Sequence, residues 1–347
     1  MTRLRSLFHL AAAIAVAAVL ARGVQAASTL DIYFIDVEGG QSTLLVTPAG
    51  QALLIDTGYA GFDNRDPNRI VAAARAAGVK RLDYLLITHF HGDHVGGAPE
   101  VVKRLAVATF VDYGEPIETS EFSQVPFAAY AAVRAHGASF HPKPGDKLPL
   151  TGVDVEVLSA GGALLTGPTQ RTAGVRNAAC GTLGKVPETN GENPRSIGVR
   201  IKFGSFRFLD LGDLPGANLA ALACPNNLLG HADVYLVPHH GNKDTAIPAV
   251  LAAVSPRVAI LNNGATKGGD PEAFSTLRET SGLEGVWQLH LSRNKGAANY
   301  PDAFIANLVD GPKDGGAWIK VSAQSSGAFS VTNGRTGMTT SFKSTRK

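Results

Sequence analysis

Residues 82–94 read LDYLLITHFHGDH, an apolar run that passes directly into four potential metal ligands within six residues. The run at 82–87 predicts a β-strand that is buried on both faces of a sheet. Polar residues at the carboxyl end of such a strand occupy the edge where α/β proteins place their binding sites. The stretch therefore predicts an α/β fold with a functional site at the end of this strand.

The spacing within this histidine block favours the binding of two ions. In an extended segment His89 and His91 point the same way, so both imidazoles can face one ion. Gly92 lets the chain turn sharply, and Asp93 and His94 can then face a second ion. Two ligand pairs on opposite sides are what a dinuclear site requires.

Further candidate ligands follow later apolar strands. Asp213 comes after one of them and is the predicted carboxylate bridge between the two ions. His239 and His240 follow another strand, and neighbouring residues of an extended chain face opposite sides. One of these two histidines is therefore expected to bind metal and the other to approach the substrate. Asp56 ends an earlier strand and is expected to orient the histidine block from behind.

The surrounding pattern alternates strands and helices, which is typical of an α/β sandwich. The first three strands predict an antiparallel meander. Asp66 and Pro67 predict the start of the first helix, with Asp66 as its N-cap. Strands are predicted at 30–36, 42–47, 52–56, 107–112, 154–158, 197–203, 206–211, 233–237, 258–261 and 286–289 and near 317–323 and 328–333. Helices are predicted from 66 to 78, at 122–136, at about 216–223 and after 270–271.

The first 26 residues have the features of a secretory signal peptide. Arg3 and Arg5 precede an apolar run at 7–20, and small residues at 24–26 suit a signal peptidase. A membrane anchor is the alternative, but the run is shorter than the roughly 20 residues that a span needs. We expect an exported protein, periplasmic or secreted, without a membrane span once the signal is removed. Residues 27–347 are expected to form one domain, with a surface insertion at 160–194 and C-terminal strands at 312–347.

The two cysteines and the charge balance fit this interpretation. Cys180 and Cys224 belong to no Cys-x-x-Cys unit, so in an exported chain they predict one disulfide, with two buried thiols as the alternative. Charged residues make up 18% of the chain, below the usual share of roughly 25%, which argues against disorder. Removing residues 1–26 takes away three arginines and no acid, which leaves 29 basic and 29 acidic side chains. The neutral chain gives no strong signal for nucleic-acid binding.

Four short motifs resemble the metallo-β-lactamase superfamily of hydrolases. They are residues 55–58, 89–94, 212–213 and 238–241, and the similarity spans most of 29–295. The motifs at 34–37, 212–213 and 238–241 resemble the ComEC-like branch and related phosphodiesterases more narrowly. This resemblance implies a four-layer αββα sandwich that holds two divalent ions, usually zinc, with manganese as the alternative.

The resemblance also implies roles for individual residues. His240 directly precedes glycine and is implied to be a metal ligand, which leaves His239 on the substrate side. Many relatives supply a third histidine to the first ion, whereas His136 and His141 lie too early in this chain to do so. Asn193 and Ser196 match the position of an Asn and a Ser in ComEC-like relatives, either as weak ligands or as groups that bind substrate or water.

These residues predict metal-assisted hydrolysis, because a bound metal lowers the pKa of water to about 7. Asp93 and His239 are the residues expected to take part in catalysis, with His239 donating to the leaving oxygen. The histidine-pair loop favours a phosphoester or other small-molecule substrate, by analogy with the family. Hydrolysis of a lactone, thioester or β-lactam is the second interpretation, and a non-catalytic metal-binding envelope protein is the third.

Overall fold

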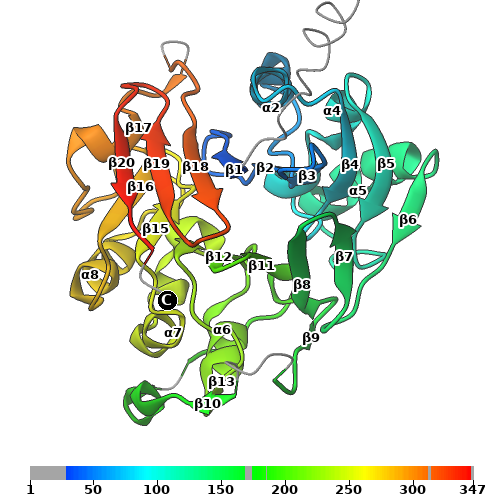
Figure 1. Ribbon diagram of the computed structural model, residues 1–347. Helices are drawn as coiled ribbons and strands as arrows, with labels where there is room; N and C mark the ends of the chain where they lie inside the picture. The colour runs from blue at the N-terminus through cyan, green and yellow to red at the C-terminus, as the bar shows by residue number, and fades with distance from the viewer. Residues whose placement is uncertain (1–28, 169–173, 185, 312–313, 345–347) are drawn as a thin grey trace, which may run out of the picture.

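Two β-sheets form the centre of the molecule in a computed structural model that describes residues 29–168, 174–184, 186–311 and 314–344 (Figure 1). The predicted signal peptide, residues 1–26, lies outside the described residues. Among the helices that are described, none is long and apolar enough to cross a membrane.

The first sheet contains nine strands within the described residues, and its middle begins with the predicted meander. β1 pairs antiparallel with β2, and β2 with β3, so the meander is confirmed. β3, β4, β5 and β6 then run parallel. In spatial order the strands are β20 (Thr339–Phe342), β19 (Phe329–Asn333), β18 (Ile319–Gln324), β1 (Thr29–Phe34), β2 (Thr43–Val46), β3 (Ala52–Ile55), β4 (Arg81–Leu86), β5 (Ala106–Val111) and β6 (Ala138–Phe140).

The second described sheet also contains a run of parallel strands. β12, β14, β15, β16 and β17 pair parallel to one another, and β11, β8 and β7 continue the sheet antiparallel. In spatial order the strands are β17 (Ile305–Asn307), β16 (Gly285–His290), β15 (Val258–Leu261), β14 (Val234–Leu236), β12 (Phe206–Asp210), β11 (Gly198–Phe203), β8 (Val153–Ala160) and β7 (Lys147–Leu150), with β9 (Ala163–Leu164) beside β8. β10 (Val175–Arg176) and β13 (Asn226–Asn227) form a separate small ribbon.

The helices gather in two groups, one on the outer face of each sheet (Figure 1). α2 (Arg65–Ala76), α3 (Gly92–Val95), α4 (Ala98–Val102) and α5 (Glu121–Arg134) lie on the side of the first sheet, and α6 (Gly216–Ala223), α7 (Pro248–Val254) and α8 (Pro271–Glu279) on the side of the second. Short 3₁₀ segments are η1 (Phe62–Asn64), η2 (Ala178–Thr182), η3 (Asn193–Arg195), η4 (His239–Gly241), η5 (Lys243–Thr245) and η6 (Asp302–Phe304).

The buried side chains show the four layers directly. In β1, Leu30, Ile32 and Phe34 belong to the core between the sheets, whereas Tyr33 and, directly after the strand, Ile35 belong to the core beneath α2, α4 and α5. This alternation follows from the two-residue period of a strand. A third core lies between the second sheet and α6, α7 and α8. The predicted αββα sandwich is therefore confirmed.

Two local predictions are wrong. Asp66 is not the N-cap of α2, because the helix begins at Arg65 and the Asp66 carboxylate instead accepts a hydrogen bond from the Tyr59 backbone N–H at 2.8 Å. β4 is buried on both faces only in its second half, since Asp83 and Tyr84 are partly exposed.

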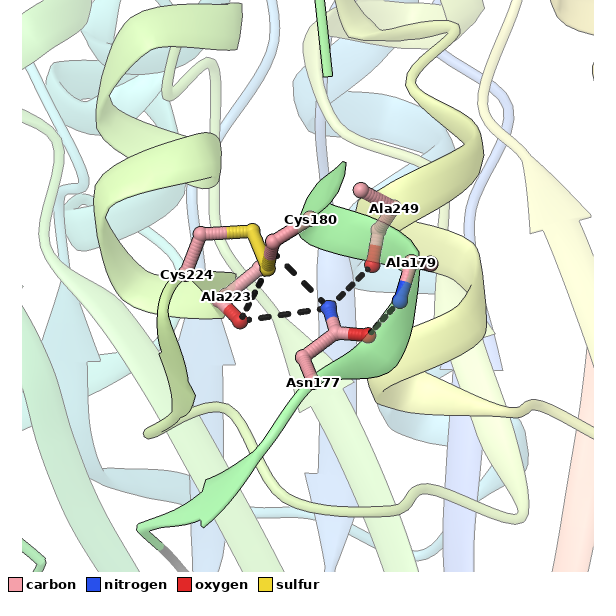
Figure 2. The surroundings of a disulfide bond; sticks show 6 residues. All are labelled: Asn177, Ala179, Cys180, Ala223, Cys224 and Ala249. Carbon is pink, nitrogen blue, oxygen red and sulfur yellow. Dashed lines mark hydrogen bonds between the residues drawn. A yellow bond between two sulfur atoms is a disulfide. The ribbon is translucent and has the colours of Figure 1, made fainter. Parts of the chain in front are cut away.

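The predicted disulfide joins Cys180 in η2 to Cys224 at the end of α6 (Figure 2). Asn177 reinforces the junction, because its side-chain amide donates to the carbonyl oxygens of Ala249 at 2.8 Å and Ala223 at 3.2 Å. This part of the predicted insertion at 160–194 is therefore fastened to α6 and α7.

Candidate metal centre

The three loops that carry the candidate ligands meet because each follows a parallel strand. The histidine block follows β4 in the first sheet, Asp213 follows β12 in the second, and His239 and His240 follow β14. The carboxyl ends of parallel strands are where α/β folds place ligands. Both sheets bring that end to the same edge of the sandwich.

Four buried side chains converge there on a small space. The nearest donor atoms of Asp93, His94, Asp213 and His240 all lie within 4.8 Å of one another. Asp213 Oδ2 lies 3.2 Å from His94 Nε2 and 3.2 Å from His240 Nε2. Asp93 Oδ2 lies 3.3 Å and 3.2 Å from the same two nitrogens.

The charges of this group fit a divalent cation. Although burial favours neutral forms, the charges of His240 and His94 hold the pKa of Asp213 well below its usual range. The pKa of His94 is raised well above its usual value, because Asp213, Asp93 and Asp56 outweigh the effect of burial. Among the described residues, His240 Nε2 and Asp213 Oδ1 are buried without a hydrogen-bond partner. Carboxylate oxygens and unpartnered imidazole nitrogen are suitable ligands for zinc or manganese.

Asp56 lies behind His94, on the side away from this group. Its Oδ2 lies 2.7 Å from His94 Nδ1, and it also accepts hydrogen bonds from Thr88 N and Thr88 Oγ1, both at 2.7 Å. Burial raises the pKa of Asp56, whereas His94 and Thr88 favour its ionised form. A proton on His94 Nδ1 leaves the Nε2 lone pair directed at Asp93 and Asp213.

His89 and His91 form a second pair beside the first group. His89 Nε2 and His91 Nδ1 are 3.0 Å apart, and His89 Nε2 is 4.0 Å from Asp213 Oδ2. Glu118 Oε2 lies 3.1 Å from His91 Nε2 and can hold a proton there, which leaves His91 Nδ1 as the acceptor. Asp213 Oδ2 thus lies within 4.0 Å of imidazole nitrogens from both sets, as a bridging carboxylate would.

Ser196 and Asn193 occupy different places. Ser196 Oγ is 3.4 Å from His89 Nδ1 and accepts the Asp213 backbone N–H at 3.3 Å, so it supports both residues from behind. Asn193 Nδ2 instead lies 3.2 Å from His239 Nε2, and Asn193 Oδ1 has no hydrogen-bond partner among the described residues. His141 pairs with Asp112 and is half exposed.

His239 lies at the rim of the group. Its Nε2 is 3.9 Å from Asp213 Oδ2, and its Nδ1 is 3.1 Å from Asp244 Oδ1. The backbone of His239 and His240 is left-handed, with φ of 51° and 57°, a conformation that costs free energy in residues other than glycine. This turn sends His240 into the buried group and leaves His239 partly exposed.

Thr88, Glu118 and Asp244 were not anticipated from the sequence. Thr88 directly precedes the histidine block and contacts both His89 and His94, so its position was a usable signal. Glu118 and Asp244 are isolated acids in loops, and no spacing relates them to the histidines.

A second group of potential ligands lies elsewhere at the sheet edge. Donor atoms of Asp36, Glu38, His290 and Asp314 also lie within 4.8 Å of one another. Here Arg69 contacts Asp36 and lies 2.7 Å from Asp314 Oδ2. The guanidinium already supplies positive charge to these carboxylates, so the group ties α2 to the ends of β1, β16 and the C-terminal segment.

Comparison with known proteins agrees with this arrangement. Residues 36–177, which include β2 to β5 and the histidine block, match the Metallo-beta-lactamase superfamily. Over these residues the chain is similar to this superfamily, which confirms the resemblance that the motifs predicted. The matched region ends before Asp213 and His240, which the structure adds to the centre.

Curated relatives match different shares of the chain. It is 24% identical over 250 residues to ComE operon protein 3 of Bacillus subtilis (strain 168), covering 67% of this chain and 28% of that protein. It is 27% identical over 228 residues to competence protein ComA of Neisseria gonorrhoeae, covering 65% of this chain and 26% of that protein. It is 32% identical over 139 residues to a hydroxyacylglutathione hydrolase of Anaeromyxobacter dehalogenans (strain 2CP-C), covering 40% of this chain and 49% of that protein. The chain therefore spans less than half the length of each of these relatives.

Proposed function

We propose that the protein is a metal-dependent hydrolase that cleaves phosphoester bonds, phosphodiesters in particular. The observation that carries this proposal is the position of Asp213 Oδ2, which lies 3.2 Å from His94 Nε2 and His240 Nε2 and 4.0 Å from His89 Nε2. One carboxylate shared by two donor sets suits a pair of divalent ions, an arrangement found in phosphatases and nucleases.

The candidate residues would have separate roles in binding metal and in donating a proton. His89, His91 and Asp213 would hold one ion, and Asp93, His94, Asp213 and His240 the other. Bound divalent ions lower the pKa of water and neutralise charge on the substrate. His239 remains partly exposed, and Asp244 fixes its Nδ1 so that Nε2 faces the centre. Against the effect of burial, Asp244 and Asp213 raise the pKa of His239, and in its protonated form His239 is placed to donate a proton to the leaving oxygen.

Carbonyl hydrolysis is the second candidate, because a hydroxyacylglutathione hydrolase is 32% identical to this chain over 139 residues. The same centre could neutralise the oxyanion that forms at a carbonyl carbon. One screen separates the candidates. Metal content is measured by mass spectrometry, and hydrolysis is followed with bis(4-nitrophenyl) phosphate, a thioester, a lactone and a chromogenic β-lactam.

The expected result is about two divalent ions per chain and the highest rate on the phosphodiester. The Asp213→Ala variant is the negative control. Hydrolysis that remains in its preparation comes from a contaminating hydrolase. A preparation that binds metal but cleaves only the thioester or lactone would favour the second candidate. Metal without turnover of any substrate would favour a metal-binding envelope protein.

We also propose that the protein is exported to the periplasm or secreted. The Cys180–Cys224 disulfide supports this location, since such bonds persist in oxidising compartments. N-terminal sequencing of the protein recovered from a periplasmic or culture fraction tests the proposal. A mature protein that begins near residue 27 is expected, and an intact Met1 would contradict it.

A further inference from the structure

Lys267 brings an unassigned positive charge to the edge of the candidate metal centre. Its ammonium contacts the carboxylate of Asp93 and lies 3.1 Å from the phenol oxygen of Tyr59. The side chain is 36% exposed, whereas that of Asp93 is 2% exposed. Lys267 therefore connects a buried ligand of the centre with solvent.

The backbone fixes Lys267 relative to the metal-binding residues. Lys267 lies in the loop between β15 and α8, where the Gly269 N–H donates to the His240 carbonyl at 2.9 Å. A Cβ on Gly268 would lie 2.1 Å from that carbonyl oxygen, so only glycine allows this approach. Gly39 also packs closely on the Lys267 stem, since a Cβ there would lie 3.0 Å from Lys267 Cβ. Lys267 is thus held in place before any ligand binds.

The contacts of the ammonium leave capacity for a ligand. A lysine ammonium has three N–H donors. Within the described part of the chain, Asp93 and Tyr59 are its hydrogen-bond partners, and they account for two of the three. A divalent ion held by Asp93 would draw on the same negative charge that now faces Lys267. Asp93 would then no longer neutralise the Lys267 ammonium fully. An anionic oxygen that reaches both the centre and Lys267 would restore that balance.

We propose that Lys267 binds a phosphoryl oxygen of the substrate and selects anionic substrates over neutral ones. This inference rests on the proposed phosphoesterase function and names the residue that sets its preference. Lysine serves this role as a compact point charge, and a charge-assisted hydrogen bond is roughly twice as strong as a neutral one.

The first test measures binding rather than turnover. Lys267→Met removes the charge and the donor, and Lys267→Gln removes the charge but keeps a donor for Asp93. Lys295→Met, at an exposed lysine in the loop after β16, is the matched control. Inorganic phosphate is titrated calorimetrically into the metal-loaded proteins, whose metal content is measured in parallel.

Both Lys267 variants are expected to bind phosphate about 10- to 100-fold more weakly, the range for one hydrogen bond to a charged group. Their metal content should equal that of the wild type, because removing a cation beside Asp93 does not oppose ion binding. Unchanged phosphate affinity would overturn the proposal. Loss of metal from Lys267→Gln would also overturn it, since Lys267 would then be a structural support for Asp93.

The second test compares two substrates that differ in charge. We expect Lys267→Gln to lower kcat/KM for bis(4-nitrophenyl) phosphate by a similar factor and to leave 4-nitrophenyl acetate within about twofold. Equal losses on both esters would contradict selection by charge. If the wild type cleaves neither ester, the proposed function fails, and the phosphate titration alone decides whether Lys267 binds an anion.

Discussion

Asp56→Asn changes one atom in the group that orients His94, and its effect can be worked out from the hydrogen bonds. Asp56 Oδ1 accepts from Thr88 N, and Oδ2 lies against both Thr88 Oγ1 and His94 Nδ1. In the variant, the asparagine oxygen must keep facing the Thr88 backbone donor, so the amide NH₂ replaces Oδ2. His94 Nδ1 then has to become an acceptor, and its proton moves to Nε2.

This tautomer removes the lone pair that faces Asp93 and Asp213. The opposite amide orientation is no better, because it places the NH₂ against the Thr88 N–H in a fully buried position. Changes to residues that orient metal-binding histidines typically cost 10- to 100-fold in metal affinity or activity. We therefore expect metal affinity at the ion held by His94 to fall by about that factor, or about 1.4 to 2.8 kcal/mol.

Competition with a chromogenic chelator measures this affinity directly. Asp233→Asn is the matched control, because Asp233 is another buried aspartate that accepts a backbone N–H, from Arg207 at 2.8 Å, but it lies at the opposite end of β14. Retention of wild-type metal affinity in Asp56→Asn, with a normal fold by circular dichroism, would refute the tautomer argument.

Three further outcomes are expected. Replacing Cys180 and Cys224 by serine should lower the free energy of unfolding by about 4 kcal/mol, because the bond closes a loop with a sequence separation of 44 residues. Urea denaturation checks this, and a loss below about 1 kcal/mol would count against it. Asp213→Ala should remove both ions, as measured by mass spectrometry, and one fully retained ion would exclude a bridging role. Burial, together with Asp314 and Asp36, raises the pKa of Glu38 from 4.5 to about 7. Between pH 4.5 and about 7 the folded state therefore binds more protons than the unfolded state. The contribution of Glu38 to the free energy of unfolding is complete below pH 4.5, and it falls by at most about 3 kcal/mol as the pH rises through 7. Glu38→Gln should flatten this slope in denaturation measured from pH 4.5 to 7.5, and the exposed Glu272→Gln should leave it unchanged.

Long periodic segments of the fold could be predicted from the sequence. The predicted helix at about 216–223 coincides with α6, and the hairpin predicted at 197–203 and 206–211 corresponds to β11 and β12. β6 and β20 were not predicted. Both are short edge strands with mostly exposed side chains, so their sequences carry no alternation of apolar and polar residues.

The candidate site could be predicted where ligand types recur at short spacing. The short spacing makes four ligands recognisable within six residues, namely His89, His91, Asp93 and His94. Glu118, in contrast, contacts His91 from 27 residues away in the sequence. Lys267 reaches Asp93 across 174 residues and from the other sheet. Such partners depend on how the two sheets pack, and no local pattern encodes that packing.

Glycine explains how loops from two separate sheets can form one centre. A Cβ on Gly40 would lie 2.4 Å from the Asp93 carbonyl oxygen, and one on Gly264 would lie 2.6 Å from the Glu38 carbonyl oxygen. With Gly268 against His240, these contacts bring backbone against backbone where any larger residue would separate the loops. The ligands sit on loops, yet their positions are set by close contacts between main chains. Because Asp93, His240 and Lys267 share these contacts, a shift in one loop would displace metal ligands and the proposed anion-binding residue together.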